Sequence, residues 1–276
     1  GSVALLGLLA LLIASFDLSS SITWIIFLIF FGFFGAWIWA MAPLSRVRNR
    51  AKAHLVSHLC GFYKLDYDAG GMGFPFEEFM GLKLLPSHSR RSMEDGIKGR
   101  VEGVPLELCE ARLTRRQSNG KGGSTTVTVF HGLLLVTPLP GPPVTDPILL
   151  LPDWGRIGNF LAGLGRKGRI TDLDAEPEFE RRYEVYAVDD KTARDRLNRA
   201  LQACLLRLAA LNDKTPSIAL VGDKLLLALP RKRNAFEGVK AFRPFDRPEP
   251  LQALLDDLEL LPAIVEALAL PPGAKA

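Results

Sequence analysis

The sequence predicts an α+β protein in which an N-terminal transmembrane helical hairpin precedes a cytoplasmic domain with a mainly antiparallel sheet and packed helices. Three observations support this fold class. From Ile22 to Ala42 there are 21 residues without a charged side chain. From Gly96 onward, β-branched and apolar runs alternate with turn residues, as is typical of antiparallel strands. Two later segments place leucines at helical spacing, which indicates amphipathic helices beside the sheet.

The uncharged stretch is long enough to cross a bilayer. At 1.5 Å per residue it spans about 30 Å, the thickness of the hydrocarbon core. Trp24 lies near one end, and Trp37 and Trp39 near the other, where aromatic rings favour the headgroup boundary. The earlier run Val3–Phe16 reaches only about 21 Å as a helix. We interpret it as a truncated first helix of the hairpin, with a signal peptide as the alternative.

Basic residues predict the orientation of this hairpin. Residues 17–21, which connect the two apolar runs, contain no Lys or Arg, whereas Arg46, Arg48, Arg50 and Lys52 follow the second run directly. By the positive-inside rule, we expect everything after Pro43 to be cytoplasmic, in a multi-pass membrane protein.

The chain divides into four predicted regions: a hairpin over 1–45, a juxtamembrane helix and connector over 46–95, a cytoplasmic α+β domain over 96–249, and a C-terminal amphipathic helix and tail over 250–276. Pro43 predicts a break between the membrane helix and the amphipathic helix that follows. Within the connector we expect a short helix or loop over 74–85 and a polar link over 86–91.

Inside the domain, the strongest strand signals are two long antiparallel runs joined by a flexible tip at 117–124. We expect a turn at Gly103–Pro105 and further strands over 148–151, 183–188, 217–221 and 224–229, the last two joined by the two-residue loop Gly222-Asp223. A short helix is predicted within 156–169. Asp189 or Asp190 should cap one helix that continues to Leu211, and the C-terminal helix should end before Pro262. No βαβ alternation is present.

Charge and cysteine content exclude some classes of protein. The net charge is +4, far below the basic density of a dedicated nucleic-acid binder, so we expect no nucleic-acid partner. Cys60, Cys109 and Cys204 are odd in number and widely spaced, which favours reduced thiols over a disulfide framework or a metal knuckle.

Four segments occur in an order that resembles a known bacterial membrane-protein family, domain of unknown function 3137. These segments are Gly96–Glu110, Val129–Leu133, Tyr183–Tyr186 followed by Asp189-Asp190, and the hairpin Ile218–Leu229. The resemblance covers about residues 46–246. It differs in Leu106 and Leu108, where the family commonly has aromatics, and in Cys109, where a small polar residue is more usual. The family has no established activity, so the resemblance implies no mechanism and makes a catalytic Cys109 less favoured.

Residues with reactive side chains form no catalytic set. His54 and His58 are four residues apart and could be half of a metal site, but no second ligand pair accompanies them, so a solvent-facing helix is the favoured interpretation. His131 lies in an apolar strand and is best interpreted as a hydrogen-bonded core histidine. The Gly120–Ser124 segment lacks phosphate-loop spacing. We therefore predict no catalytic residue, no cofactor and no metal.

Basic residues instead suggest a surface for anionic lipids. One group follows the membrane segment, one surrounds the hairpin tip and one follows the last hairpin. The candidates are Arg46, Arg48, Arg50, Lys52, Arg112, Arg115, Arg116, Lys121, Arg231, Lys232 and Arg233.

The functional expectation is a noncatalytic scaffold or adaptor, anchored in the bacterial inner membrane with its domain in the cytoplasm. Its partners would be the lipid bilayer and either a second copy or another membrane or cytoplasmic protein. The alternative is a module that senses a ligand or an anionic lipid. A membrane-associated enzyme using His131 or Cys109 is the third reading.

Overall fold

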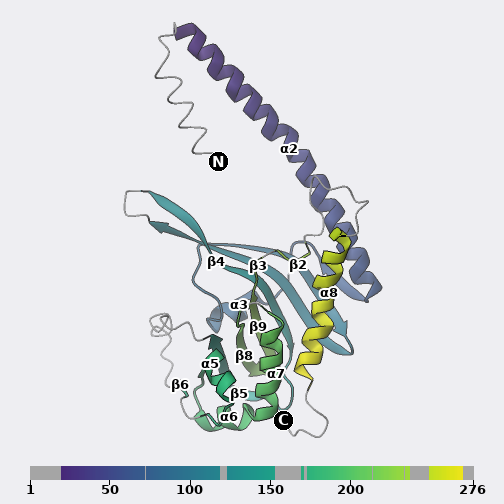
Figure 1. The fold of residues 1–276 in the computed structure, drawn as a ribbon, viewed down its shortest axis with the longest axis vertical. Helices are drawn as coiled ribbons and strands as arrows, with labels where there is room; N and C mark the ends of the chain where they lie inside the picture. Colours follow the sequence, from purple (N-terminus) through teal and green to yellow (C-terminus); the bar gives the residue numbers. More distant parts are fainter. Residues whose placement is uncertain are drawn as a thin grey trace. The chain divides into compact units, whose positions relative to one another are not determined.

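The computed structural model describes residues 20–71, 73–118, 123–152, 169–170, 173–212, 214–232, 234–236 and 249–269. The chain divides into two compact units, residues 1–51 and residues 52–276. Figure 1 shows the helices and strands with the labels used below.

Helix α2 (Ser20–Phe62) belongs to both units. It runs through Pro43 without the expected break, because a proline removes one backbone hydrogen bond and the ladder can resume beyond it. Between Ile25 and Phe34, eight large apolar side chains are 41–70% exposed. Within the described part of the chain, no helix combines the length and apolar character needed to cross a membrane. The predicted first helix, Val3–Phe16, lies outside the described residues.

A nine-stranded antiparallel sheet forms the centre of the second unit, as the predicted α+β class requires. The strand order is β1-β2-β3-β4-β9-β8-β5-β7-β6. The strands are β1 (Leu65–Asp68), β2 (Arg90–Val101), β3 (Val104–Ser118), β4 (Ser124–Pro138), β5 (Val144–Pro152), β6 (Arg169–Ile170), β7 (Tyr183–Tyr186), β8 (Ser217–Gly222) and β9 (Lys224–Pro230). The last strand in sequence, β9, therefore lies between β4 and β8 in the middle of the sheet.

Most predicted strands are confirmed, but several boundaries differ: β5 already begins at Val144, and β7 ends at Tyr186. Strand β2 already begins at Arg90, within the segment expected to be a polar link. The β2–β3 turn lies at Glu102-Gly103, where both residues have positive φ, and Val104 and Pro105 are already in β3. Val221 pairs with Lys224 across Gly222-Asp223, as expected for a two-residue hairpin loop.

Apolar side chains alternate between the two faces of the sheet and build two cores. On one face, Leu225, Leu227 and Leu229 join a large core that includes residues of α2, α5, α6, α7 and α8. On the other, Leu226 and Ala228 join a smaller core with Phe76 and Phe79 of α3. The helix bounds are α3 (Phe76–Gly81), α5 (Pro177–Arg182), α6 (Asp190–Arg196), α7 (Arg199–Ala210) and α8 (Glu249–Leu268).

Two helix predictions need correction. Asp189 caps α6 as expected, but the helix ends at Arg196, and Asn198 starts α7 by accepting a hydrogen bond from the backbone N–H of Leu201. Helix α8 continues through Pro262, because buried apolar residues on both sides of it, among them Leu261 and Ile264, pack in the core and offset the lost hydrogen bond. The short helix predicted within 156–169 falls largely outside the described residues.

Candidate functional site

Three buried carboxylates form a charge cluster beside the large core. Asp95 of β2, Glu110 of β3 and Asp257 of α8 are each less than 10% exposed. Each has a cationic or imidazole partner: Lys52 for Asp95, His131 for Glu110 and Arg231 for Asp257. Because an unpaired buried charge is costly, these pairs indicate a built feature of the domain. We call these six residues, together with Tyr67, the charge cluster.

Asp95 receives its position from a bulge in β2. The register shifts between Glu94 and Ile97, and Asp95 has φ 52°, a left-handed conformation that Asp tolerates better than most residues. Its two carboxylate oxygens lie 2.5 Å from Lys52 Nζ and 2.6 Å from the Tyr67 hydroxyl. Burial raises the pKa of the Asp95 carboxyl, while the bonds from Lys52 and Tyr67 oppose that rise. Burial also raises the pKa of Tyr67, and its hydrogen bond to Asp95 adds to the effect.

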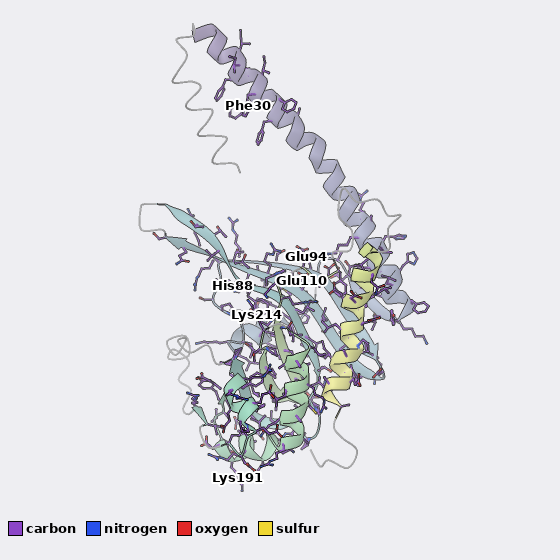
Figure 2. The ribbon with its side chains drawn as sticks, in the orientation of Figure 1. Phe30, His88, Glu94, Glu110, Lys191 and Lys214 are labelled. Atoms are coloured by element: carbon purple, nitrogen blue, oxygen red, sulfur yellow. The ribbon has the colours of Figure 1, made fainter. Side chains whose placement is uncertain are left out.

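Glu110 joins two strands and a later segment. His131 Nε2 lies 2.8 Å from one carboxylate oxygen, and the backbone N–H of Ala235 donates to the other at 3.0 Å. Figure 2 shows Glu110 beside Glu94, its partner on β2. Burial, followed by the nearby Asp95 charge, raises the pKa of Glu110 to about 8. Glu110 therefore loses its proton at a higher pH in the folded protein than an exposed glutamate would.

Asp257 connects α8 to the segment after β9. Phe236, with φ 55°, donates its backbone N–H to Asp257 Oδ2 at 2.8 Å, and Arg231 lies 3.1 Å from Oδ1. Since Ala235 and Phe236 are consecutive, Glu110 and Asp257 hold neighbouring backbone N–H groups. Asp257 is 1% exposed, because it lies three residues from Leu254 and four from Leu261 on the buried stripe of α8.

A pocket of about 240 Å³ adjoins the charge cluster through Tyr67 and Gly96, which are part of its lining. Its other lining residues include Asp66, Asp68, Phe74, Lys98, Glu107 and Leu108. Lys98 forms an ion pair with Glu107. The wall depends on close glycine contacts, since a Cβ at Gly96 would lie 2.9 Å from Gly71 Cα. The pocket could accept a small polar molecule with a cationic group.

The candidate catalytic side chains do not combine into a reactive set. Cys109 is buried on the face opposite Glu110, since successive strand residues alternate, and burial raises the pKa of its thiol to about 12. His131 is hydrogen-bonded, as predicted, with Glu110 as its partner. The His54 and His58 rings lie 4.6 Å apart, and among the described residues no group of three or more His, Cys, Asp or Glu could hold a metal ion.

The predicted lipid-surface residues do not share one environment. Lys52 and Arg231 are 17% and 16% exposed and pair with Asp95 and Asp257, so they belong to the charge cluster. Others are exposed: Arg50, Arg112, Arg115, Arg116 and Lys232. The side chains of Arg46 and Arg48, and all of Lys121 and Arg233, lie outside what the structure describes.

Sequence reasoning missed the carboxylates of the charge cluster, although two of them leave a signal. Glu110 follows Leu106 and Leu108 at strand spacing, so a carboxylate occupies a core-facing position. Asp95-Gly96 interrupts a strand with the residue types found at bulges. Tyr67 offers no comparable signal, because β1 has only four residues.

Comparison with known proteins places the chain in a family. A family described as "Protein of unknown function (DUF3137)" matches residues 128–270, just over half of the chain. The chain belongs to this family. The match begins within β4 and extends beyond α8, so it includes His131, Arg231 and Asp257 of the charge cluster.

Other comparisons add no function. No curated protein matches the chain. Among solved structures, it is similar to the crystal structure of the mycobacterial trehalose monomycolate transport factor A, TtfA, at 10% identity and a TM-score of 0.36. That match covers 81% of this chain and 99% of the other.

Proposed function

We propose that the protein is a membrane-anchored, noncatalytic scaffold or adaptor whose sheet domain lies on the cytoplasmic side of the bacterial inner membrane. The observation that supports anchoring is the exposure of eight large apolar side chains between Ile25 and Phe34 in α2. A contiguous exposed apolar patch of this kind is typical of a membrane or protein interface. The uncharged stretch and the basic residues after it agree with anchoring.

Anchoring is tested by fractionating cells that express the full chain. We expect the protein in the membrane pellet after an alkaline carbonate wash. Lysines in place of Leu28 and Ile29, which are 69% and 66% exposed, should release it, since each lysine costs about 2.5–3.5 kcal/mol at the centre of a membrane helix. Lysines in place of the exposed Val188 and Leu211 serve as the control and should leave the protein in the pellet. Wild-type protein in the soluble fraction would rule out anchoring.

The scaffold role is tested by the size of the assembly. The same aromatic-rich segment could pack against a second copy, so we propose that the protein forms homo-oligomers. Mass photometry of the full chain in nanodiscs should give masses above that of one chain plus an empty nanodisc, and crosslinking in cells should capture a stable partner. A monomer with no crosslinked partner argues against a scaffold.

The pocket beside Tyr67 favours a second candidate function, a module that senses a ligand or an anionic lipid. Three carboxylates line the pocket and only Lys98 counters them, so a small amine is the class of ligand to test. Putrescine should raise the melting temperature of the full chain, and the double change Asp66→Asn, Asp68→Asn should abolish that rise. No shift with putrescine would remove the support for the ligand-sensing form of this candidate.

A further inference from the structure

Strands β3 and β4 extend beyond the rest of the sheet as a two-stranded arm. The last residue of β3 paired with β2 is Thr114, and β4 pairs with β9 only from Gly132 onward. Beyond these points the two strands pair with each other alone, as far as Ser118 with Ser124. Figure 1 shows this extension projecting past the neighbouring strands. We call β3 residues 115–118 and β4 residues 124–128, together with the exposed Arg112 side chain at their base, the arginine arm.

The arginine arm is free of negative charge. The sequence contains no Asp or Glu between Glu110 and Asp146, whereas Arg112, Arg115, Arg116 and Lys121 lie in that interval. The three arginines are exposed and pair with neutral oxygens: Arg112 with the Asn234 side chain at 2.6 Å, Arg115 with Ser87 at 3.4 Å and Arg116 with Ser124 at 2.5 Å. None forms an ion pair with a carboxylate of the described residues, so their positive charge is uncompensated there.

Exposed hydroxyl groups lie along the same ribbon as these arginines. Thr125, Thr126 and Thr128 are exposed on β4, and Ser89, Ser118 and Ser124 are exposed beside them. Guanidinium groups bind phosphate through paired N–H donors, and hydroxyl groups supply further donors. Protection of a sheet edge against aggregation explains charged side chains on the arm, but charges of either sign would serve that purpose. The absence of acidic residues therefore points to an anionic partner.

We propose that the arginine arm binds the phosphate groups of anionic phospholipids. The choice of lipid over a soluble phosphate rests on the membrane anchoring proposed above, which would keep the arm in the same compartment as headgroups. Nucleic acid is less favoured, since three or four cations on a chain of net charge +4 make a small electrostatic footprint. Under this proposal, the arm supplies the lipid-binding residues among the basic residues that the sequence suggested. Lys52 and Arg231 belong instead to the charge cluster.

The test measures binding of a fluorescent short-chain phosphatidylglycerol to the full chain in neutral detergent micelles, with phosphatidylcholine as the uncharged comparison. The double change Arg115→Gln, Arg116→Gln should weaken phosphatidylglycerol binding at least about fivefold if one of these cations contacts the lipid, and roughly 30-fold if both do, since each contributes about 1 kcal/mol. The charge-matched control Arg181→Gln, Lys191→Gln, both exposed on other elements, should change binding less than twofold. Circular dichroism confirms that each variant is folded.

A second double variant provides an independent test in case the first one does not fold. Ser118→Glu with Thr125→Glu places negative charge on exposed positions of the arm and should weaken binding by a similar factor. Unchanged binding in both arm variants, or equal binding of phosphatidylcholine, would overturn the proposal. Equal competition by inorganic phosphate would replace lipid by free phosphate, and tighter binding of single-stranded DNA would replace it by nucleic acid. Binding that persists although the chain fails to pellet with membranes would contradict anchoring while leaving the arm's phosphate binding intact.

Discussion

The β3–β4 ribbon has two halves with opposite surroundings. In the inner half, from Glu107 to Leu113 and from Phe130 to Val136, neighbouring strands flank the ribbon and both faces join buried cores. In the outer half, the arginine arm has only its own pairing and is mostly exposed. The same two strands therefore carry two members of the charge cluster, Glu110 and His131, in one half and an uncompensated cationic surface in the other. The two halves share the same β3–β4 pairing and differ in burial. The difference in burial therefore explains why ionisable side chains pair with one another in the inner half and remain exposed in the outer half.

The largest expected effect concerns a carboxylate that supports the inner half. Asp257→Ala removes the partner of Arg231 and of the Phe236 N–H, leaving a buried cation and a buried donor. We expect the free energy of unfolding to fall by about 3–5 kcal/mol. Urea denaturation of the full chain in micelles measures this, with the exposed neighbour Asp256→Ala as the control. A fall of less than about 1 kcal/mol in the free energy of unfolding would mean that the charge cluster tolerates the loss of the Asp257 carboxylate.

Apolar truncation compares the two halves directly. Leu134→Ala, at a position with 0% exposure in the inner half, should destabilise the fold by about 2–5 kcal/mol through lost burial and a cavity. Val127→Ala, in the arm, should cost less than about 1 kcal/mol, because its side chain is only partly buried. Similar losses in the two variants, measured by the same denaturation, would show that the arm is packed against something else.

The pH dependence of stability reports on Glu110. Because the folded pKa is raised from 4.5 to about 8, the folded state binds more protons than the unfolded state across that interval. Stability therefore falls as pH rises from about 4.5 to about 8. Glu110→Gln keeps a polar group facing His131 and Ala235 but removes this titration, so its melting temperature should change less over the same interval. If the melting temperatures of the wild type and the variant depend on pH in the same way, the titrating group is another member of the charge cluster, for example Asp95.

The smallest effect is expected in the arm. Arg116→Ala removes an exposed side chain that donates a hydrogen bond to the hydroxyl group of Ser124, so stability should change by less than about 0.5 kcal/mol. Differential scanning calorimetry checks this value. A clear destabilisation would mean that the arm's arginines hold the ribbon together, which would weaken the case for a binding surface.

Much of the sheet could be predicted from the sequence because its signals are local. Gly222-Asp223 predicts its hairpin, and the β-branched run before Pro138 predicts a long strand. The break between α6 and α7 was missed, since apolar residues at helical spacing continue across it, although Asn198 is a cap residue. Proline signals at Pro43 and Pro262 were read as helix ends, but tertiary packing can outweigh one lost hydrogen bond.

The charge cluster was harder to predict because it depends on register. His131 was correctly interpreted as a hydrogen-bonded core residue, but its partner Glu110 lies diagonally across the β3–β4 pair, opposite Leu133. The register of the β3–β4 pair determines which residue lies diagonally opposite His131. Hydrophobic periodicity within each strand does not reveal that register. Asp95 and Lys52 are 43 residues apart, and no local pattern connects them. The exposed arginines of the arm were identified from composition alone, because their environment requires no tertiary partner.

The position of β9 in the middle of the sheet has a consequence for the order of folding during synthesis. Strands β1–β4 and β5–β8 are made first, yet β4 and β8 cannot complete their pairing until Lys224–Pro230 has left the ribosome. Until then both strands present unpaired apolar edges, and Glu110 lacks its Ala235 donor. A nascent chain stopped before β9 should therefore bind chaperones strongly, whereas one extended past Asp257 should release them.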